Sequence, residues 1–219
     1  MSEEWQLLRS GPGEAAWNMA VDEALLGESS VPVLRLYAWS SPAATFGYFQ
    51  RYEEIAAATP LRPLIRRCTG GGLVPHDGDW TYSLIIPPGH DWYALKADES
   101  YRRVHDWVSR SMGNGAILAE CCDVEGKGRC FVGYEKHDVL LEGKKIAGAA
   151  QRRNRSGLMI QGSIQPPVGS SRAQWEDRFL EEKPNAARWN ETDLSASVHE
   201  AATSLVAKKY GLEKYNRRR

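Results

Sequence analysis

The stretch Arg66-Arg67-Cys68-Thr69-Gly70-Gly71-Gly72-Leu73-Val74-Pro75-His76-Asp77 decides how the rest of the chain is interpreted. Its three consecutive glycines separate a strand-like run at 64–67 from another at 80–86. Glycine weakens a strand, so three together indicate a backbone that turns through positive φ or lies directly against a ligand. An ordinary glycine-rich turn remains the alternative, because neither the dinucleotide-binding glycine spacing nor the Gly-Lys-Ser/Thr ending of a phosphate loop is present.

Composition favours a single-domain intracellular protein. The chain has 219 residues, of which 42% are hydrophobic, and this suffices for one sizeable core. Its 28 basic residues balance 28 acidic ones, so no overall charge favours nucleic acid or a membrane surface. The first residues lack the basic and apolar regions of a signal peptide, and no apolar run approaches the roughly 18 residues of a membrane span. We therefore expect a cytoplasmic protein.

The four cysteines, at positions 68, 121, 122 and 130, are expected to be free thiols, because a chain of this length needs no disulfide. A zinc site is disfavoured, since adjacent Cys121 and Cys122 lack the Cys-x-x-Cys spacing and no paired histidines accompany them. We predict no metal site.

Hydrophobic periodicity predicts an α+β chain in which three main helices interrupt the strands. The main helices are expected at 14–26, 100–112 and 195–210, and shorter ones at 55–63 and 174–180. Strands are expected as one hairpin at 31–37 and 43–49, as a second at 138–142 and 145–150, and at 64–67, 80–86 and 158–164. The segments 114–136 and 184–193 are irregular and are expected to be loops.

Three segments carry a family resemblance: the glycine stretch with TYSLIIP at 81–87, GKKIAGAAQRR at 143–153, and NMAVDEALL at 18–26. Over about residues 5–216 they resemble the lipoate-protein ligase A and lipoyl/octanoyl transferase family, and within it its cysteine-dependent octanoyltransferases of LipM type. The resemblance implies the α+β fold of class II aminoacyl-tRNA synthetase and biotin/lipoate ligase catalytic domains, with a mostly antiparallel or mixed central sheet flanked by helices. We expect residues 1–219 to form one such domain, without a separate C-terminal accessory domain.

Lys145 is the first candidate catalytic residue. A lone lysine is usually a solvated charge, and Lys144 is expected to be one, because alternation along a strand places the two on opposite faces. The small residues that follow, including Gly148 and Ala149, let a ligand approach the backbone. By the resemblance, the Lys145 ammonium meets the acyl carbonyl and stabilises the oxyanion of acyl transfer.

The glycine stretch supplies the opposite wall of the predicted pocket. The resemblance implies that the acyl group, or an adenylate in a ligase, is bound by Arg67, Thr69, Gly70, Gly71, Gly72 and His76 together with Gly148 and Ala149. For His76, a structural role tied to Asp77 or to a backbone carbonyl stays open. Asp22 and Glu23 are equally compatible with carboxylates on a helix surface.

Cys130 is the candidate nucleophile. Most cysteines are small buried residues or incidental thiols, but Cys130 stands fifteen residues before Lys145, as in the octanoyltransferases that the chain resembles. The basic residues Lys127, Arg129 and Lys145 favour its thiolate. The implied reaction moves octanoyl from acyl carrier protein to Cys130, and then to a lysine of a lipoyl domain or of the glycine cleavage H protein, without a cofactor.

Three alternatives remain open at the level of sequence. A lipoate-protein ligase catalytic domain would need ATP and Mg²⁺. An amidotransferase would move octanoyl between lipoyl domains. A non-catalytic acyl-binding or carrier-domain-binding protein would keep the pocket without turnover, and Gln161 motivates this reading, because the resembling transferases have histidine at this point of a Gln-His-Gly-Ser motif.

Overall fold

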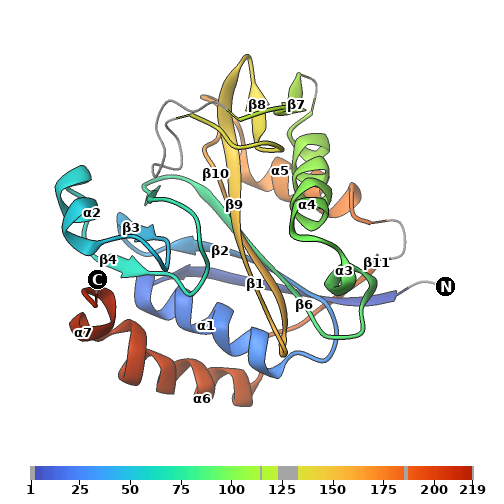
Figure 1. Ribbon diagram of the computed structural model, residues 1–219. Helices are drawn as coiled ribbons and strands as arrows, with labels where there is room; N and C mark the ends of the chain where they lie inside the picture. Colours follow the sequence, from blue (N-terminus) through green and yellow to red (C-terminus); the bar gives the residue numbers. More distant parts are fainter. Residues whose placement is uncertain (1–2, 114, 123–132, 185–186, 219) are drawn as a thin grey trace.

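The computed structural model describes residues 3–113, 115–122, 133–184 and 187–218, and the largest feature of this part of the chain is an eight-stranded sheet (Figure 1). Its strands lie in the order β11 (Ala187–Glu191), β1 (Glu3–Gly13), β2 (Val33–Trp39), β6 (Trp80–Ile86), β10 (Gly157–Ile164), β9 (Lys144–Asn154), β8 (Val139–Leu141) and β7 (Ala116–Leu118). Strand β1 is parallel to both of its neighbours, and the other neighbouring pairs are antiparallel. The sheet is therefore mixed, and the second predicted hairpin is confirmed as β8 and β9.

A smaller sheet in the described residues contains β4 (Leu64–Arg66), β3 (Ala43–Phe46) and β5 (Val74–His76), in that order. Helix α2 (Tyr52–Ala58) packs beside it through Ile55, which belongs to the same apolar cluster as Phe46. The predicted hairpin of 31–37 with 43–49 is wrong, since β2 and β3 lie in different sheets. Strand β2 pairs with β1 on one edge and β6 on the other, so neither edge is available to β3.

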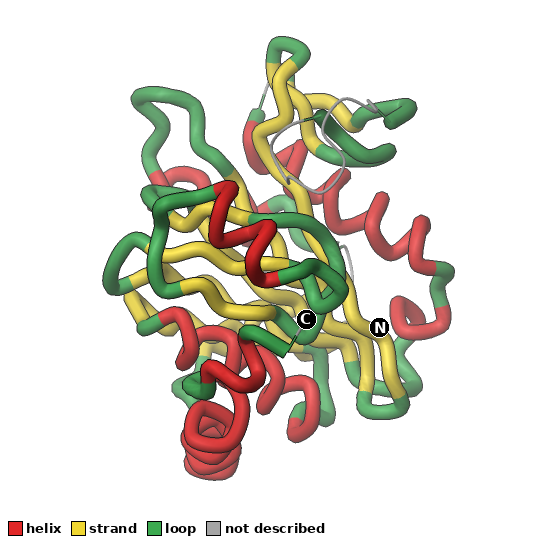
Figure 2. The backbone as a smooth tube through the Cα atoms, turned by 60° about the vertical axis from the view of Figure 1, so that its left-hand side comes forward, coloured by secondary structure: helices red, strands yellow, loops and turns green. Residues whose placement is uncertain are grey.

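Helices cover both faces of the large sheet (Figures 1 and 2). On one face lie α1 (Ala15–Glu28) and α6 (Ala196–Leu205), the latter continued by the π-helical turn η1 (Val206–Tyr210). On the other lie α4 (Ala97–Met112) and α5 (Arg172–Glu181), with the short α3 (Asp91–Ala94) before α4. The last helix, α7 (Glu213–Asn216), contacts β4. The three main helices predicted from periodicity are all present.

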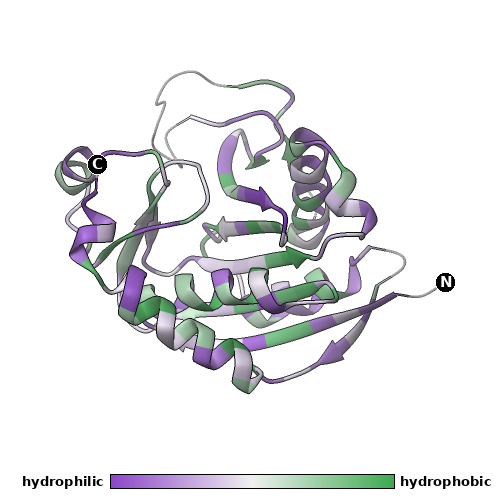
Figure 3. Ribbon diagram, turned by 60° about the horizontal axis from the view of Figure 1, so that its bottom comes forward, coloured by the Kyte–Doolittle hydropathy of each residue, from purple (hydrophilic) through white to green (hydrophobic). Residues whose placement is uncertain are grey.

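Two apolar clusters fill the space between the sheet and these helices, and Figure 3 shows the hydrophobic residues along the central strands. On the α4 side, aromatic rings stack, with Trp107 and Trp175 each lying against Phe179. On the other side α6 covers α1, so α1 is buried on most of its surface. As a result Asp22 is fully buried, and the helix-surface alternative is wrong for this residue.

Several elements were not predicted from the sequence, namely β1, β5, β7, β11, α3 and α7. The segment expected to be a loop at 184–193 contains β11, which pairs in parallel with β1. Most of β11 is exposed, so it lacks the alternation by which an edge strand can be recognised. No helix within the described ranges combines the length and the apolar character that crossing a membrane requires.

Candidate active site

A pocket lies between the small sheet, β2 and the pair β9 and β10. It encloses about 410 Å³ of empty space, including its open mouth, which suits a small organic group. Of the residues predicted to bind substrate, Arg67, His76, Gly148 and Ala149 line it. Segments far apart in the sequence therefore meet at one cavity.

Arg67 organises the glycine stretch. Its guanidinium donates hydrogen bonds of 2.9 and 2.8 Å to the carbonyl oxygens of Gly70 and Gly72. Gly71 has a φ of +82°, as the sequence predicted for this stretch. A Cβ atom on Gly47 would lie 1.9 Å from the carbonyl oxygen of Gly71, so the two loops pack backbone against backbone. In the described structure the three glycines shape the pocket through Arg67 and do not line it themselves.

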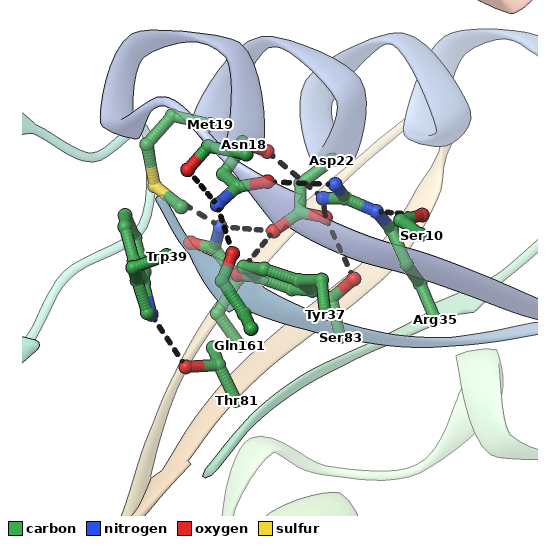
Figure 4. Close-up of polar contacts among 12 residues, drawn as sticks. Ser10, Asn18, Met19, Asp22, Arg35, Tyr37, Trp39, Thr81, Ser83 and Gln161 are labelled. Atoms are coloured by element: carbon green, nitrogen blue, oxygen red, sulfur yellow. Dashed lines mark hydrogen bonds and ion pairs between the residues drawn. The ribbon is translucent and has the colours of Figure 1, made fainter. Parts of the chain in front are cut away.

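Gln161 joins the glycine stretch to helix α1, and Figure 4 shows its contact with Asp22 of that helix. Its Oε1 accepts a 2.8 Å hydrogen bond from Thr69 Oγ1, and its Nε2 donates one of 2.7 Å to Asp22 Oδ2. The buried Asp22 carboxylate also accepts from Arg35 Nη1 at 2.7 Å and from the Tyr37 hydroxyl at 3.0 Å. Thr69 thus holds Gln161 and does not itself line the pocket, whereas Gln161 does.

His76 is fixed through both of its ring nitrogens. Nδ1 lies 2.9 Å from Asp79 Oδ2, Nε2 lies 2.7 Å from Thr45 Oγ1, and the ring stacks on Trp39 at a centroid distance of 3.7 Å. Burial lowers the pKa of His76, which favours the neutral ring. A carboxylate only accepts, so Nδ1 donates to Asp79, and Nε2 accepts from the Thr45 hydroxyl. The carboxylate partner is Asp79 and not Asp77, which is exposed.

Lys145 is not among the residues that line this pocket, but its side chain lies beside Gly148, which is. Its Nζ is 2.6 Å from Asp138 Oδ2, and the two side chains are 9% and 0% exposed. A Cβ atom on Gly148 would lie 2.9 Å from this Nζ, so the ammonium reaches the pocket wall at Gly148. Lys144 is exposed, as alternation predicted. A cation held here, away from bulk water, can stabilise negative charge that develops on a bound carbonyl oxygen.

The remaining predicted catalytic residue, Cys130, lies outside the described residues. The cysteines that the structure does describe, Cys68, Cys121 and Cys122, are free thiols, as expected. Burial raises the pKa of the Cys68 thiol to about 11, which makes it a poor nucleophile at neutral pH. Within the described residues no three His, Cys, Asp or Glu side chains are grouped so that they could hold a metal ion.

Among the residues missed from the sequence, Asp138, Thr45 and Asp79 hold predicted site residues in place. Asp138 directly precedes β8, and the β8–β9 hairpin brings it against Lys145. The hairpin was predicted, so this contact could have been found by aligning the two strands. Thr45 lies in an otherwise apolar strand, and such an isolated polar residue indicates a buried hydrogen bond. No sequence pattern pointed to Asp79.

The chain is similar to known proteins in both sequence and fold. A family model described as the lipoyl protein ligase A/B catalytic domain matches residues 14–206. The octanoyltransferase LipM of Kyrpidia tusciae is 36% identical over 180 residues, which cover 73% of this chain and 65% of that protein. The chain therefore spans just under two thirds of the length of this relative.

Solved structures share the fold at low sequence identity. Lipoate-protein ligase A bound with ATP has a TM-score of 0.78 and 22% identity, over 99% of both chains. Protein Ta0514 from T. acidophilum, with bound lipoic acid, has a TM-score of 0.81 and 22% identity, over 100% of both chains. The predicted α+β fold of lipoate-ligase type is confirmed.

Proposed function

Because this chain belongs to the lipoyl protein ligase A/B catalytic domain family, we propose that it transfers an octanoyl or lipoyl group from acyl carrier protein to a lysine of a lipoyl domain or of the glycine cleavage H protein. The similarity to a protein named octanoyltransferase supports this reaction class. The proposal treats the chain as one catalytic domain that works in the cytoplasm and needs no cofactor.

The observation that carries the proposal is the position of the Lys145 ammonium beside Gly148, a residue of the pocket wall. An acyl chain bound along Gly148 and Ala149 would have its carbonyl group near this cation. The remainder of the chain would extend toward Val74 and Trp39, which supply apolar surface further along the same pocket. Lys145 would then lie where the carbonyl oxygen gains charge in the transition state.

The proposed reaction has two steps. The Cys130 thiolate attacks the thioester carbonyl of the octanoyl carrier protein, forming a new thioester and releasing the carrier's thiolate. The amine of the acceptor lysine then attacks this acyl-enzyme, an amide forms, and the Cys130 sulfur leaves and takes up a proton from the amine. In both steps Lys145 polarises the carbonyl and stabilises the tetrahedral oxyanion. Thioester exchange is nearly isoenergetic and aminolysis is downhill, so the scheme consumes no ATP.

Intact-mass spectrometry after mixing with octanoyl carrier protein, without ATP, tests the proposal. We expect a single octanoyl adduct that hydroxylamine removes and that passes to an added lipoyl domain. The adduct should be absent in Cys130→Ala and present in Cys122→Ala, which removes an exposed thiol instead. Transfer should be strongly reduced in Lys145→Met and nearly normal in Lys144→Met, which removes the exposed neighbour.

Other outcomes would identify the alternatives. Modification of a lipoyl domain only when free acid, ATP and Mg²⁺ are supplied would overturn the transferase and indicate a ligase. Octanoyl transfer from an octanoylated lipoyl domain, but not from carrier protein, would indicate an amidotransferase. Saturable binding without turnover of any donor would indicate a binding protein.

A further inference from the structure

Helix α4 places one hydroxyl group directly behind the lysine and aspartate pair. The Tyr101 hydroxyl donates a 2.5 Å hydrogen bond to Asp138 Oδ1, the carboxylate oxygen that does not face Lys145. The same hydroxyl oxygen accepts a 3.2 Å hydrogen bond from the backbone N–H of Ala149. One oxygen atom thus touches both the partner of the candidate catalytic lysine and the wall of the pocket.

Asp138 depends on a small set of donors. Its side chain is fully buried, with Oδ2 accepting from Lys145 Nζ at 2.6 Å and from the Glu135 N–H at 2.7 Å. Tyr101 is the donor to Oδ1, and burial together with the charge of Asp138 raises the pKa of Tyr101 well above its usual range, so it stays protonated. A short hydrogen bond to a carboxylate is strong and directional. Losing it leaves a buried oxygen that bulk water does not reach, and the carboxylate can rotate.

The bond to Ala149 acts on the strand itself. Strand β8 pairs with Lys144, Lys145 and Ala147, and its pairing with β9 extends no further. Past the end of β8, the Tyr101 hydroxyl accepts a hydrogen bond from the Ala149 N–H on this edge of β9. On the other edge, β10 pairs with Gly148, Ala149 and Ala150. The part of β9 that lines the pocket is therefore held by β10 on one edge and by this tyrosine on the other.

We propose that Tyr101 is a positioning residue for acyl transfer, which sets the orientation of Lys145 through Asp138 and ties it to the pocket wall at Ala149. The proposal rests on the acyl-transfer function inferred above. Tyr101 does not contact the acyl group in this scheme. Its effect is exerted in the transition state, where the Lys145 ammonium must keep one N–H on Asp138 and direct another at the oxyanion.

The chain offers a matched control. Tyr93, in α3, donates a 3.0 Å hydrogen bond to the backbone oxygen of Asn154 at the opposite end of β9. Tyr101→Phe and Tyr93→Phe each remove one hydroxyl group that forms a hydrogen bond with the backbone of β9. Only the Tyr101 hydroxyl also bonds to Asp138, the partner of Lys145. The acyl-binding wall keeps its pairing with β10 in both variants, so substrate binding should change little.

Steady-state kinetics and NMR of the full chain test the proposal. In Tyr101→Phe we expect kcat for octanoyl transfer to fall about tenfold with KM for octanoyl carrier protein unchanged, and the ¹⁵Nζ resonance of Lys145 to shift. Tyr93→Phe should keep the wild-type kcat, KM and Lys145 ¹⁵Nζ resonance. Equal kcat in the two variants, or an unshifted Lys145 resonance in Tyr101→Phe, overturns the proposal. If the wild-type protein transfers no octanoyl group, the proposed function has failed, and the NMR comparison alone decides the positioning role.

Discussion

The Nζ atom of Lys145 reaches Asp138 Oδ2 by passing over the α-carbon of Gly148. A Cβ atom at position 148 would lie 2.8 Å from Cε and 2.9 Å from Nζ of the lysine, and 3.2 Å from Asp138 Oδ1. The glycine of the Lys-Ile-Ala-Gly segment therefore makes room for an ion pair as well as for a substrate.

Gly148→Ala should reduce octanoyl transfer strongly while leaving the fold intact. The new methyl group meets the flexible end of a lysine, which can move aside, so the loss of stability should stay near 1 kcal/mol. The displaced ammonium no longer faces the carbonyl. Kinetics and thermal unfolding check this, with Gly27→Ala as the control, because nothing lies within 4 Å of a Cβ atom there. A Gly148→Ala enzyme with wild-type kcat would contradict the role given to Lys145.

Asp22→Asn should destabilise the protein by about 3 kcal/mol or more, because it leaves the buried Arg35 guanidinium without its counter-charge. Glu23→Gln is the control. Glu23 is the next residue, and it pairs with Lys209 at a site where both side chains are about a fifth exposed. Because the unpaired Lys209 ammonium can reach water there, we expect a smaller loss than for Asp22→Asn. Urea unfolding of both variants measures the difference. Equal losses of unfolding free energy in the two variants would show that the Asp22–Arg35 pair stabilises the fold no more than the Glu23–Lys209 pair does.

Gln161→Leu should weaken both stability and transfer, whereas Gln161→His should retain much of each. Leucine removes the acceptor of the Thr69 hydroxyl and one donor to Asp22, at about 1–3 kcal/mol for each buried group left unpaired. A neutral histidine can donate from one nitrogen and accept at the other, so it can keep both bonds. Thermal unfolding and kcat/KM test this. Identical behaviour of the two variants would refute the bridging role.

Stability should decrease as the pH falls from about 6.5 toward 4, partly through His105. Burial lowers the pKa of His105 from 6.5 to about 4, so in this interval the unfolded chain binds a proton that the folded chain does not. The free energy of unfolding therefore rises with pH there. A shift of this size corresponds to about 3 kcal/mol. In His105→Gln the decrease between these pH values should be smaller by about that amount, as measured by urea unfolding at each pH; parallel curves would be the contrary result.

Periodicity and motif order predicted the fold class, the three main helices, the β8 and β9 hairpin and the placement of four substrate-binding candidates around one pocket. The prediction of strand pairing failed where contacts between distant strands override the local sequence pattern. Strand β3 looks like the return strand of a hairpin, but both edges of β2 are occupied. The role of Tyr101 could not be assigned from the sequence, because it arises only when α4 and β9 pack together.

The parallel pairing of β1 with β11 also bears on how the chain folds as it is synthesised. Glu3 lies opposite Ala187 and Leu7 opposite Glu191, so residues from the two ends of the sequence are neighbours in one sheet. A nascent chain can pair β1 with β2 early, but the outer edge of β1 stays open until the ribosome has made residues 187–191. Trp5 and Leu7 belong to β1, and in the complete fold both are buried, with Trp5 in contact with Trp189 of β11. Such high contact order slows the last folding step, and it leaves an open strand edge on which unfinished chains can aggregate.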